Sequence, residues 1–164
     1  MNAKPDTVKA SPVRLWTAVI RLKMKVAAEI RPLLAQYELT GPQWAAIRTL
    51  DEAAGDGLRL SELSRRLCVT EGNVTGLVDR LAEGGMVERI PHPDDRRVII
   101  ARLTAAGEEV CAHVAPLFEA RLEELFASLG PGELEALADS LERLATQVES
   151  IGQAEGAAAA AEEK

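Results

Sequence analysis

The segment LSELSRRLCVTEGNVTGLVDRLAEGGMVERIPHPDDRRVIIARLT, residues 60–104, decides the fold of this chain. Its first leucines are spaced three and four residues apart, which places them on one face of a helix over 60–67. Residues 68–70 leave room only for a tight turn. The Thr70 hydroxyl is suited to cap a second helix that starts at Glu71. This order predicts a helix-turn-helix.

The second helix, 71–83, is predicted to bury one apolar face, formed by Val74, Leu77, Val78 and Leu81. Each of its glycines lowers helix stability by roughly 1 kcal/mol relative to alanine. Close approach of the backbone to a ligand surface is one reason to keep them, and a weak helix is the alternative. The polar face holds the residues expected to meet DNA, which are Gly72, Asn73, Thr75, Gly76, Asp79 and Arg80.

A β-hairpin is predicted after this helix. Gly84 and Gly85 supply the positive φ that a helix C-terminus favours. The runs 86–90 and 98–103 suit two strands joined by a charged turn. An arginine held by a neighbouring carboxylate suits a narrow, electronegative minor groove, although charged tips can also be merely solvated. The tip carries His92, Asp94, Asp95, Arg96 and Arg97.

Further helices are predicted on both sides of this segment. Residues 15–33 carry an apolar stripe that Pro32 is expected to kink or end. Thr40 and Gln43 match a capping box for a helix over 42–50. These helices and the hairpin make the expected fold class mainly α with a small β-hairpin wing, an α+β winged helix-turn-helix.

The C-terminal part predicts two helices separated by a Gly-Pro-Gly turn. Apolar residues in 132–151 alternate at spacings of three and four, a seam that one helix cannot bury alone. A dimer interface and an intramolecular core both remain open for it. The expected divisions are a mobile tail 1–10, a dimerisation helix 11–39, the DNA-binding domain 40–104, C-terminal dimerisation helices 105–151 and a low-complexity tail 152–164.

Length and charge distribution are compatible with one nucleic-acid-binding domain. The 164 residues carry a net charge of −7, which phosphate repels. Residues 59–104 nevertheless hold eight arginines against seven carboxylates, whereas 105–164 hold three basic and thirteen acidic residues. Salt screens charges beyond about 10 Å. No apolar run reaches the roughly 20 residues of a membrane span, so a cytoplasmic protein without membrane contact is expected.

In order and spacing, five motifs resemble the MarR family of transcriptional regulators. They are LSRRL at 63–67, NVTGLVDRL at 73–81, VER at 87–89, DDRR at 94–97 and LTAAG at 103–107. The resemblance implies a homodimeric repressor that reads a pseudo-palindromic double-stranded DNA operator. The second helix of the motif would enter the major groove, and an Asp-x-Arg arginine, here Arg97 after Asp95, the minor groove. Many relatives carry a larger polar or basic side chain where this chain has Gly76.

Side-chain chemistry assigns roles within this interface. Asn73 can pair bidentately with adenine, and Thr75 can touch a thymine methyl group. The phosphate candidates, which set register without reading sequence, are Arg65, Arg66, Thr70, Arg80 and Arg96.

The resemblance also implies a small-molecule effector, often an aromatic or apolar acid, between the dimer helices and the winged domain. Filling of the core explains the two tryptophans equally well. The residues suited to such a pocket are Trp16, Lys23, Trp44, Arg48 and His113.

Two other functions stay open. Cys68 or Cys111 would make the protein a thiol-based redox sensor, although cysteines in a cytosolic chain are more often small buried hydrophobes. A winged helix can also be a protein-interaction module, but Asn73, Thr75 and Arg97 favour DNA over a partner that needs aromatic anchors. Metal-ligand spacings and catalytic motifs are absent from the sequence, so no metal, cofactor or enzymatic activity is expected.

Overall fold

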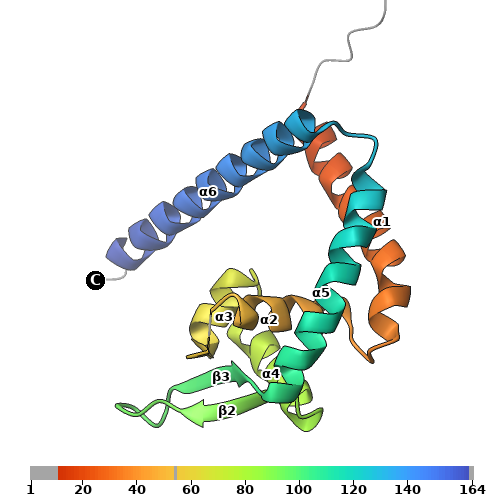
Figure 1. The fold of residues 1–164 in the computed structure, drawn as a ribbon. Helices are drawn as coiled ribbons and strands as arrows, with labels where there is room; N and C mark the ends of the chain where they lie inside the picture. The colour runs from red at the N-terminus through yellow and green to blue at the C-terminus, as the bar shows by residue number, and fades with distance from the viewer. Residues whose placement is uncertain (1–10, 54, 163–164) are drawn as a thin grey trace, which may run out of the picture. The chain divides into compact units, whose positions relative to one another are not determined.

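The computed structural model describes residues 11–53 and 55–162, with the side chains of 153–162 excepted. Within these residues the chain forms six helices and one three-stranded sheet (Figure 1). The predicted mainly α fold with a small sheet is therefore confirmed. The chain divides into two compact units, one up to Arg121 and one from Leu122 onward. The predicted tail 1–10 lies outside the described residues.

Helix α1 (Pro12–Ala35) begins at Ser11, whose hydroxyl accepts a backbone N–H of the first turn at 3.2 Å. Pro32, expected to kink or end this helix, does not end it, because α1 continues to Ala35. Ile30 and Leu34 are buried on either side of the proline. Their packing outweighs the single backbone hydrogen bond that a proline removes.

Helix α2 (Gly41–Asp51) carries the predicted capping box. Thr40 Oγ1 accepts from the Gln43 N–H at 3.4 Å, and Gln43 Oε1 accepts from the Thr40 N–H at 2.9 Å. Trp44 and Ile47 are buried on its inner face. The helix is thus fixed at its start by local hydrogen bonds and along its length by the core.

The helix-turn-helix forms as predicted, with α3 at Leu60–Arg66 and α4 at Glu71–Glu83. Cys68 closes α3 in the left-handed region, at φ 53°, where glycine is usual. The Thr70 hydroxyl accepts a backbone N–H of α4 at 3.4 Å, and Gly85, at φ 71°, ends α4. The predicted apolar face of α4 is buried: Val74, Leu77, Val78 and Leu81.

The sheet is antiparallel, in the order β1 (Leu58–Arg59), β3 (Ile99–Leu103), β2 (Val87–Pro91). Strands β2 and β3 form the predicted hairpin, in which Arg89 lies opposite Ala101. Strand β1 pairs with the other edge of β3. The hairpin is therefore anchored to the chain segment that leads into α3.

The backbone at Gly85 and Met86 joins α4, the hairpin and helix α5 (Ala105–Phe126). The Met86 N–H donates to a carbonyl near the end of α4 at 2.9 Å, and the Met86 carbonyl accepts from the Thr104 N–H at 3.1 Å. The Thr104 hydroxyl donates to the Gly85 carbonyl at 2.7 Å and accepts from the Gly107 N–H at 3.1 Å. A Cβ on Gly107 would collide with the Met86 carbonyl. We call these four residues the Met86 junction.

Apolar residues are exposed on α1 and on helix α6 (Pro131–Glu162), each within its own unit. Within the second unit, the predicted seam of α6 is exposed. None of the described helices is long and apolar enough to cross a membrane. The exposed residues are Val13, Leu15, Trp16, Val19, Ile20, Leu22 and Met24 on α1, and Leu134, Leu137, Leu141, Leu144, Val148 and Ile151 on α6.

Replacing Gly107 by alanine should destabilise the fold by about 1–3 kcal/mol, because the added methyl group meets the Met86 carbonyl. Thermal unfolding followed by circular dichroism measures this. Gly76→Ala is the matched control, since a Cβ there meets only Arg80 Nη1, at 3.5 Å, among the residues that the structure describes. Its melting temperature should rise, because alanine favours a helix by about 1 kcal/mol over glycine. An unchanged melting temperature for Gly107→Ala would contradict the close approach.

Candidate functional site

Helix α4 and the hairpin share one surface hollow. It measures about 250 Å³ and is lined by residues of α3, α4 and the hairpin, among them Ser61, Thr75 and Arg97. Thr75 and Arg97 lie far apart in the sequence and were assigned to different grooves of DNA. The fold brings them to the same face of the winged domain.

The exposed side of α4 carries few long side chains. Thr75 Oγ1 donates to the Glu71 carbonyl at 2.9 Å, so its methyl group is what remains for a base. Asn73, two residues earlier in α4, is exposed. Gly72 and Gly76 contribute backbone only, and a Cβ at Gly72 would meet no described residue within 4 Å. This surface permits close approach of a flat or grooved partner.

At the tip of the hairpin, Asp95 holds Arg97. Its carboxylate accepts from the Arg97 backbone N–H, Nε and Nη2 at 3.0, 3.0 and 3.1 Å. These hydrogen bonds hold the pKa of Asp95 below its ordinary value. The Arg97 side chain is nevertheless 91% exposed. The tip therefore presents a guanidinium whose orientation is set by the carboxylate two residues before it.

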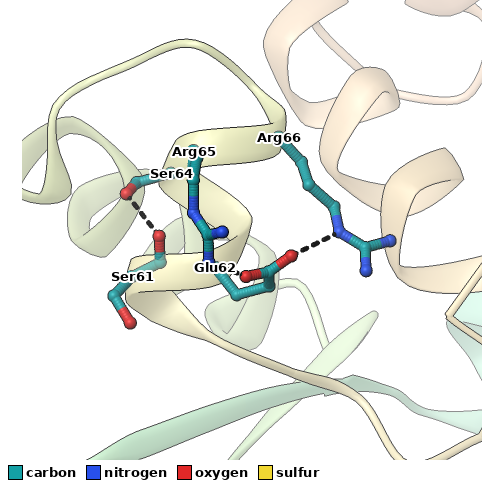
Figure 2. A network of polar contacts seen from close by, with 5 residues as sticks. All are labelled: Ser61, Glu62, Ser64, Arg65 and Arg66. Atoms are coloured by element: carbon teal, nitrogen blue, oxygen red, sulfur yellow. Dashed lines mark hydrogen bonds and ion pairs between the residues drawn. The ribbon is translucent and has the colours of Figure 1, made fainter. Parts of the chain in front are cut away.

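On α3, Glu62 binds both predicted phosphate contacts of that helix. Its carboxylate accepts from Arg65 Nη2 and, at 2.9 Å, from Arg66 Nε (Figure 2). The bond from Arg66 contributes most to lowering the pKa of Glu62. Figure 2 also shows Ser64 donating to the Ser61 carbonyl, at 2.9 Å, within the same helix. A phosphate would have to share these guanidinium groups with Glu62.

The other predicted DNA contacts differ in their surroundings. Arg80 and Arg96 are exposed. Thr70 uses one oxygen lone pair in capping α4, which leaves its O–H free to donate. Asp79 forms an ion pair with Arg89 of β2 and so is engaged within the domain.

A second feature is an open cleft of about 480 Å³ between α1, α2 and α5. Its walls are mostly apolar, and Trp44 and Phe118 pack there with ring centroids 5.5 Å apart. Lys23 and Arg48 bring two positive charges to its lining. All of these residues belong to the first compact unit. The combination suits a small molecule with an apolar ring and a negative group.

Trp44 also carries an unused hydrogen-bond donor. The residue is 3% exposed, and its buried indole Nε1 has no partner among the described residues. A buried donor without a partner lowers stability by about 1–3 kcal/mol.

Arg48 links the cleft to α5. Its Nη1 donates to Glu119 at 2.9 Å, its Nη2 lies 3.7 Å from Glu52, and its guanidinium lies 6.0 Å from the Trp44 ring centroid. The bond to Glu119 is the main reason that the pKa of Arg48 is raised. An anion in the cleft would compete with Glu119 for this arginine.

The other two predicted effector residues lie outside this cleft. Trp16 is exposed on α1 and lines a separate shallow hollow with Met24. His113 is exposed on α5, with Nδ1 2.7 Å from the Glu109 carbonyl. The fold thus brings together three of the five predicted residues, Lys23, Trp44 and Arg48.

The two cysteines differ. Cys111 is buried, as expected, and its burial raises the pKa of its thiol to about 11, with Asp51 adding to the shift. Cys68 is exposed in the turn, so the expectation of burial is wrong there. The turn forces Cys68 outward because it occupies the left-handed position that closes α3. Among the described residues, no His, Cys, Asp and Glu cluster is suited to a metal ion.

Sequence reasoning missed several partners of the site. Glu62 precedes its arginines by three and four residues, so helical spacing alone could have found that pairing. The contacts of Phe118 with Trp44 and of Glu119 with Arg48 join helices distant in sequence. No local sequence pattern predicts these two contacts.

Known proteins share the sequence pattern. The MarR family model matches residues 39–99. The multiple antibiotic resistance protein MarR of Escherichia coli (strain K12) is 34% identical over 105 residues, 63% of this chain and 72% of that protein. The HTH-type transcriptional regulator FarR of Neisseria gonorrhoeae is 28% identical over 127 residues, 77% of this chain and 86% of FarR.

Solved structures share the fold. A mutant MarR from E. coli complexed with operator DNA has a TM-score of 0.74 at 26% identity, and the match covers 80% of this chain and 94% of that one. NadR in complex with 4-hydroxyphenylacetate has a TM-score of 0.70 at 27% identity, with 87% and 98% covered.

The two thiols should react very differently with an aromatic disulfide reagent. At pH 8 only about one Cys111 thiol in a thousand is ionised if its pKa is about 11, and burial blocks access. The native protein should therefore release one chromophore per chain rapidly, and Cys68→Ser should release none until it is unfolded. Rapid reaction of both thiols in the native protein would contradict the burial of Cys111.

Proposed function

Since the chain belongs to the MarR family of transcriptional regulators, we propose that it is a homodimeric repressor that binds a pseudo-palindromic operator and leaves it when an aromatic acid binds. The main observation in favour of DNA binding is the hollow that Thr75 and Arg97 line together. It supports the assignment of α4 to the major groove and of the hairpin tip to the adjacent minor groove.

The exposed apolar faces of α1 and α6 support the dimer. Each face presents a stripe of large apolar side chains with helical spacing. Exposed patches of this kind mark association surfaces, and a second copy of the chain offers the same faces in return. A symmetric dimer would place its two recognition helices in successive major grooves, about 10 base pairs apart.

The cleft between α1, α2 and α5 supports the effector. Trp44 and Phe118 supply an aromatic wall, and Lys23 and Arg48 supply positive charge. One similar structure, NadR, is a complex with 4-hydroxyphenylacetate, which combines an aromatic ring and a carboxylate. We assign Lys23, Trp44, Arg48 and Phe118 of this chain to an effector of that chemical class.

Selection from a pool of random DNA duplexes, at two salt concentrations, tests the DNA half. The protein should enrich an inverted repeat whose half-sites lie about 10 base pairs apart. Failure to enrich any sequence, with binding lost at moderate salt, would overturn the proposal in favour of a protein-interaction module.

Arg97→Ala should weaken binding to the selected operator by about tenfold or more, because the minor-groove contact is lost. The loss should be similar for all A·T-rich variants of the operator. Asp95→Asn is the control: it keeps the guanidinium and removes only the carboxylate that orients it, so its loss should be smaller. Measured affinities that are equal for Arg97→Ala and the wild-type protein would exclude this role.

The effector prediction uses 4-hydroxyphenylacetate as the probe and Trp44 fluorescence as the signal, in a Trp16→Phe background. Binding should be saturable and should release operator DNA. Arg48→Met should weaken it by about tenfold or more, as expected when a charge-assisted hydrogen bond is lost. Arg21→Met is the matched control, since Arg21 lies on α1 but lines the other hollow. Equal binding by both variants would rule out the cleft as the carboxylate site.

A further inference from the structure

We propose that Arg80 reads a base: it lies back over Gly76 and presents its guanidinium to a guanine in the major groove. This inference rests on the proposed function and replaces the phosphate role expected for Arg80 from the sequence. Its geometric basis is a row of residues four apart on the side of α4 away from the core, Gly72, Gly76 and Arg80.

The side chain of Arg80 runs toward the N-terminal half of α4. A Cβ placed on Gly76 would have Arg80 Nη1 at 3.5 Å as its one neighbour within 4 Å among the described residues, apart from the helix backbone nearby. Side chains of a helix lean toward its N-terminus and cover the preceding turn. In a helix-turn-helix, the N-terminal residues of the recognition helix meet the base edges. The guanidinium therefore lies where a side chain of residue 76 would otherwise stand.

Gly76 makes this arrangement possible. A methyl group at that position would still leave ordinary contact distance to Arg80 Nη1, but a longer side chain would occupy the same space as the guanidinium. With glycine at 72 and 76, Arg80 supplies the side chain in this row of three residues. Arg80 can thus contact a base from the position that a side chain at residue 76 would otherwise occupy.

The donors of Arg80 are also available. In residues 11–53 and 55–162 its side chain has no hydrogen bond or ion pair, whereas Arg97 is held by Asp95. The neighbouring acid, Asp79, is engaged by Arg89 of β2 and does not neutralise Arg80. A free guanidinium has two parallel N–H groups that match O6 and N7 of guanine, the commonest specific contact in the major groove.

Selection from the random pool with Arg80→Ala, beside the wild-type protein, tests the inference. The variant should lose its preference for one G·C pair in each half-site, and affinity for the wild-type operator should fall about tenfold to a hundredfold. Affinity for an operator already changed at that pair should stay the same. Arg80→Lys keeps the charge without the planar fork and should weaken this preference without abolishing it.

A phosphate role would give a different pattern. Arg80→Ala would then weaken all sequences alike and reduce the slope of log K against log salt by about one per protomer, with base preferences retained. That result would overturn the inference and leave the proposed function intact. No enrichment by the wild-type protein would overturn both.

An operator with 7-deazaguanine at the assigned guanine lacks the N7 acceptor and gives an independent check. Wild-type affinity should drop on this operator, and Arg80→Ala should show no further drop. Equal drops for both proteins would contradict the contact. Circular dichroism confirms that each variant is folded, which is expected for changes at these accessible positions.

Discussion

The arrangement of the winged domain depends on the backbone of Met86. Its N–H donates to a carbonyl near the end of α4, and its carbonyl accepts from the N–H of Thr104, which lies between β3 and α5. Because Gly107 has no side chain, α5 can approach that carbonyl closely. Because both polar groups of this residue are used in linking different elements, α4, the hairpin and the start of α5 cannot shift independently without breaking hydrogen bonds. The same α5 carries Phe118, which lines the cleft, and Glu119, which binds Arg48. A displacement of α5 therefore has a direct physical connection to the elements assigned to DNA.

The electrostatics of the DNA face follow from pairing rather than from net charge. The arginines of the winged domain are almost balanced by carboxylates, and Glu62, Asp79 and Asp95 each bind one or more of them. Paired guanidinium groups keep their orientation but contribute less to long-range attraction of phosphate. Such a surface favours binding that depends on the fit of oriented side chains, since nonspecific affinity comes mainly from unpaired positive charge.

Local patterns were sufficient to predict most of the winged domain. The caps at Thr40 and Thr70, the buried stripe of α4 and the hairpin all follow from interactions between residues close in sequence. Other features depend on tertiary packing, which no local pattern encodes. Continuation of α1 past Pro32 depends on the burial of its flanking residues, and the Trp44–Phe118 contact depends on how α2 and α5 meet. The side-chain types in the sequence predicted five effector-binding residues. Only the fold shows that three of them line the cleft and that Trp16 and His113 do not.

The cleft places two positively charged side chains beside an apolar, aromatic wall. Lys23 and Arg48 stand at its opening, and Trp44, which lines it, has a buried indole N–H without an acceptor among the described residues. An anionic occupant would gain binding free energy from Lys23 and Arg48. In the proposed function that occupant is an aromatic acid, whose carboxylate competes with Glu119 for Arg48. Release of Glu119 would remove the ion pair between α5 and α2. Helix α5 is also the helix that the Met86 junction connects to α4 and the hairpin. In this proposal the charge of the ligand, rather than its size alone, changes the contacts that connect the cleft to the elements assigned to DNA.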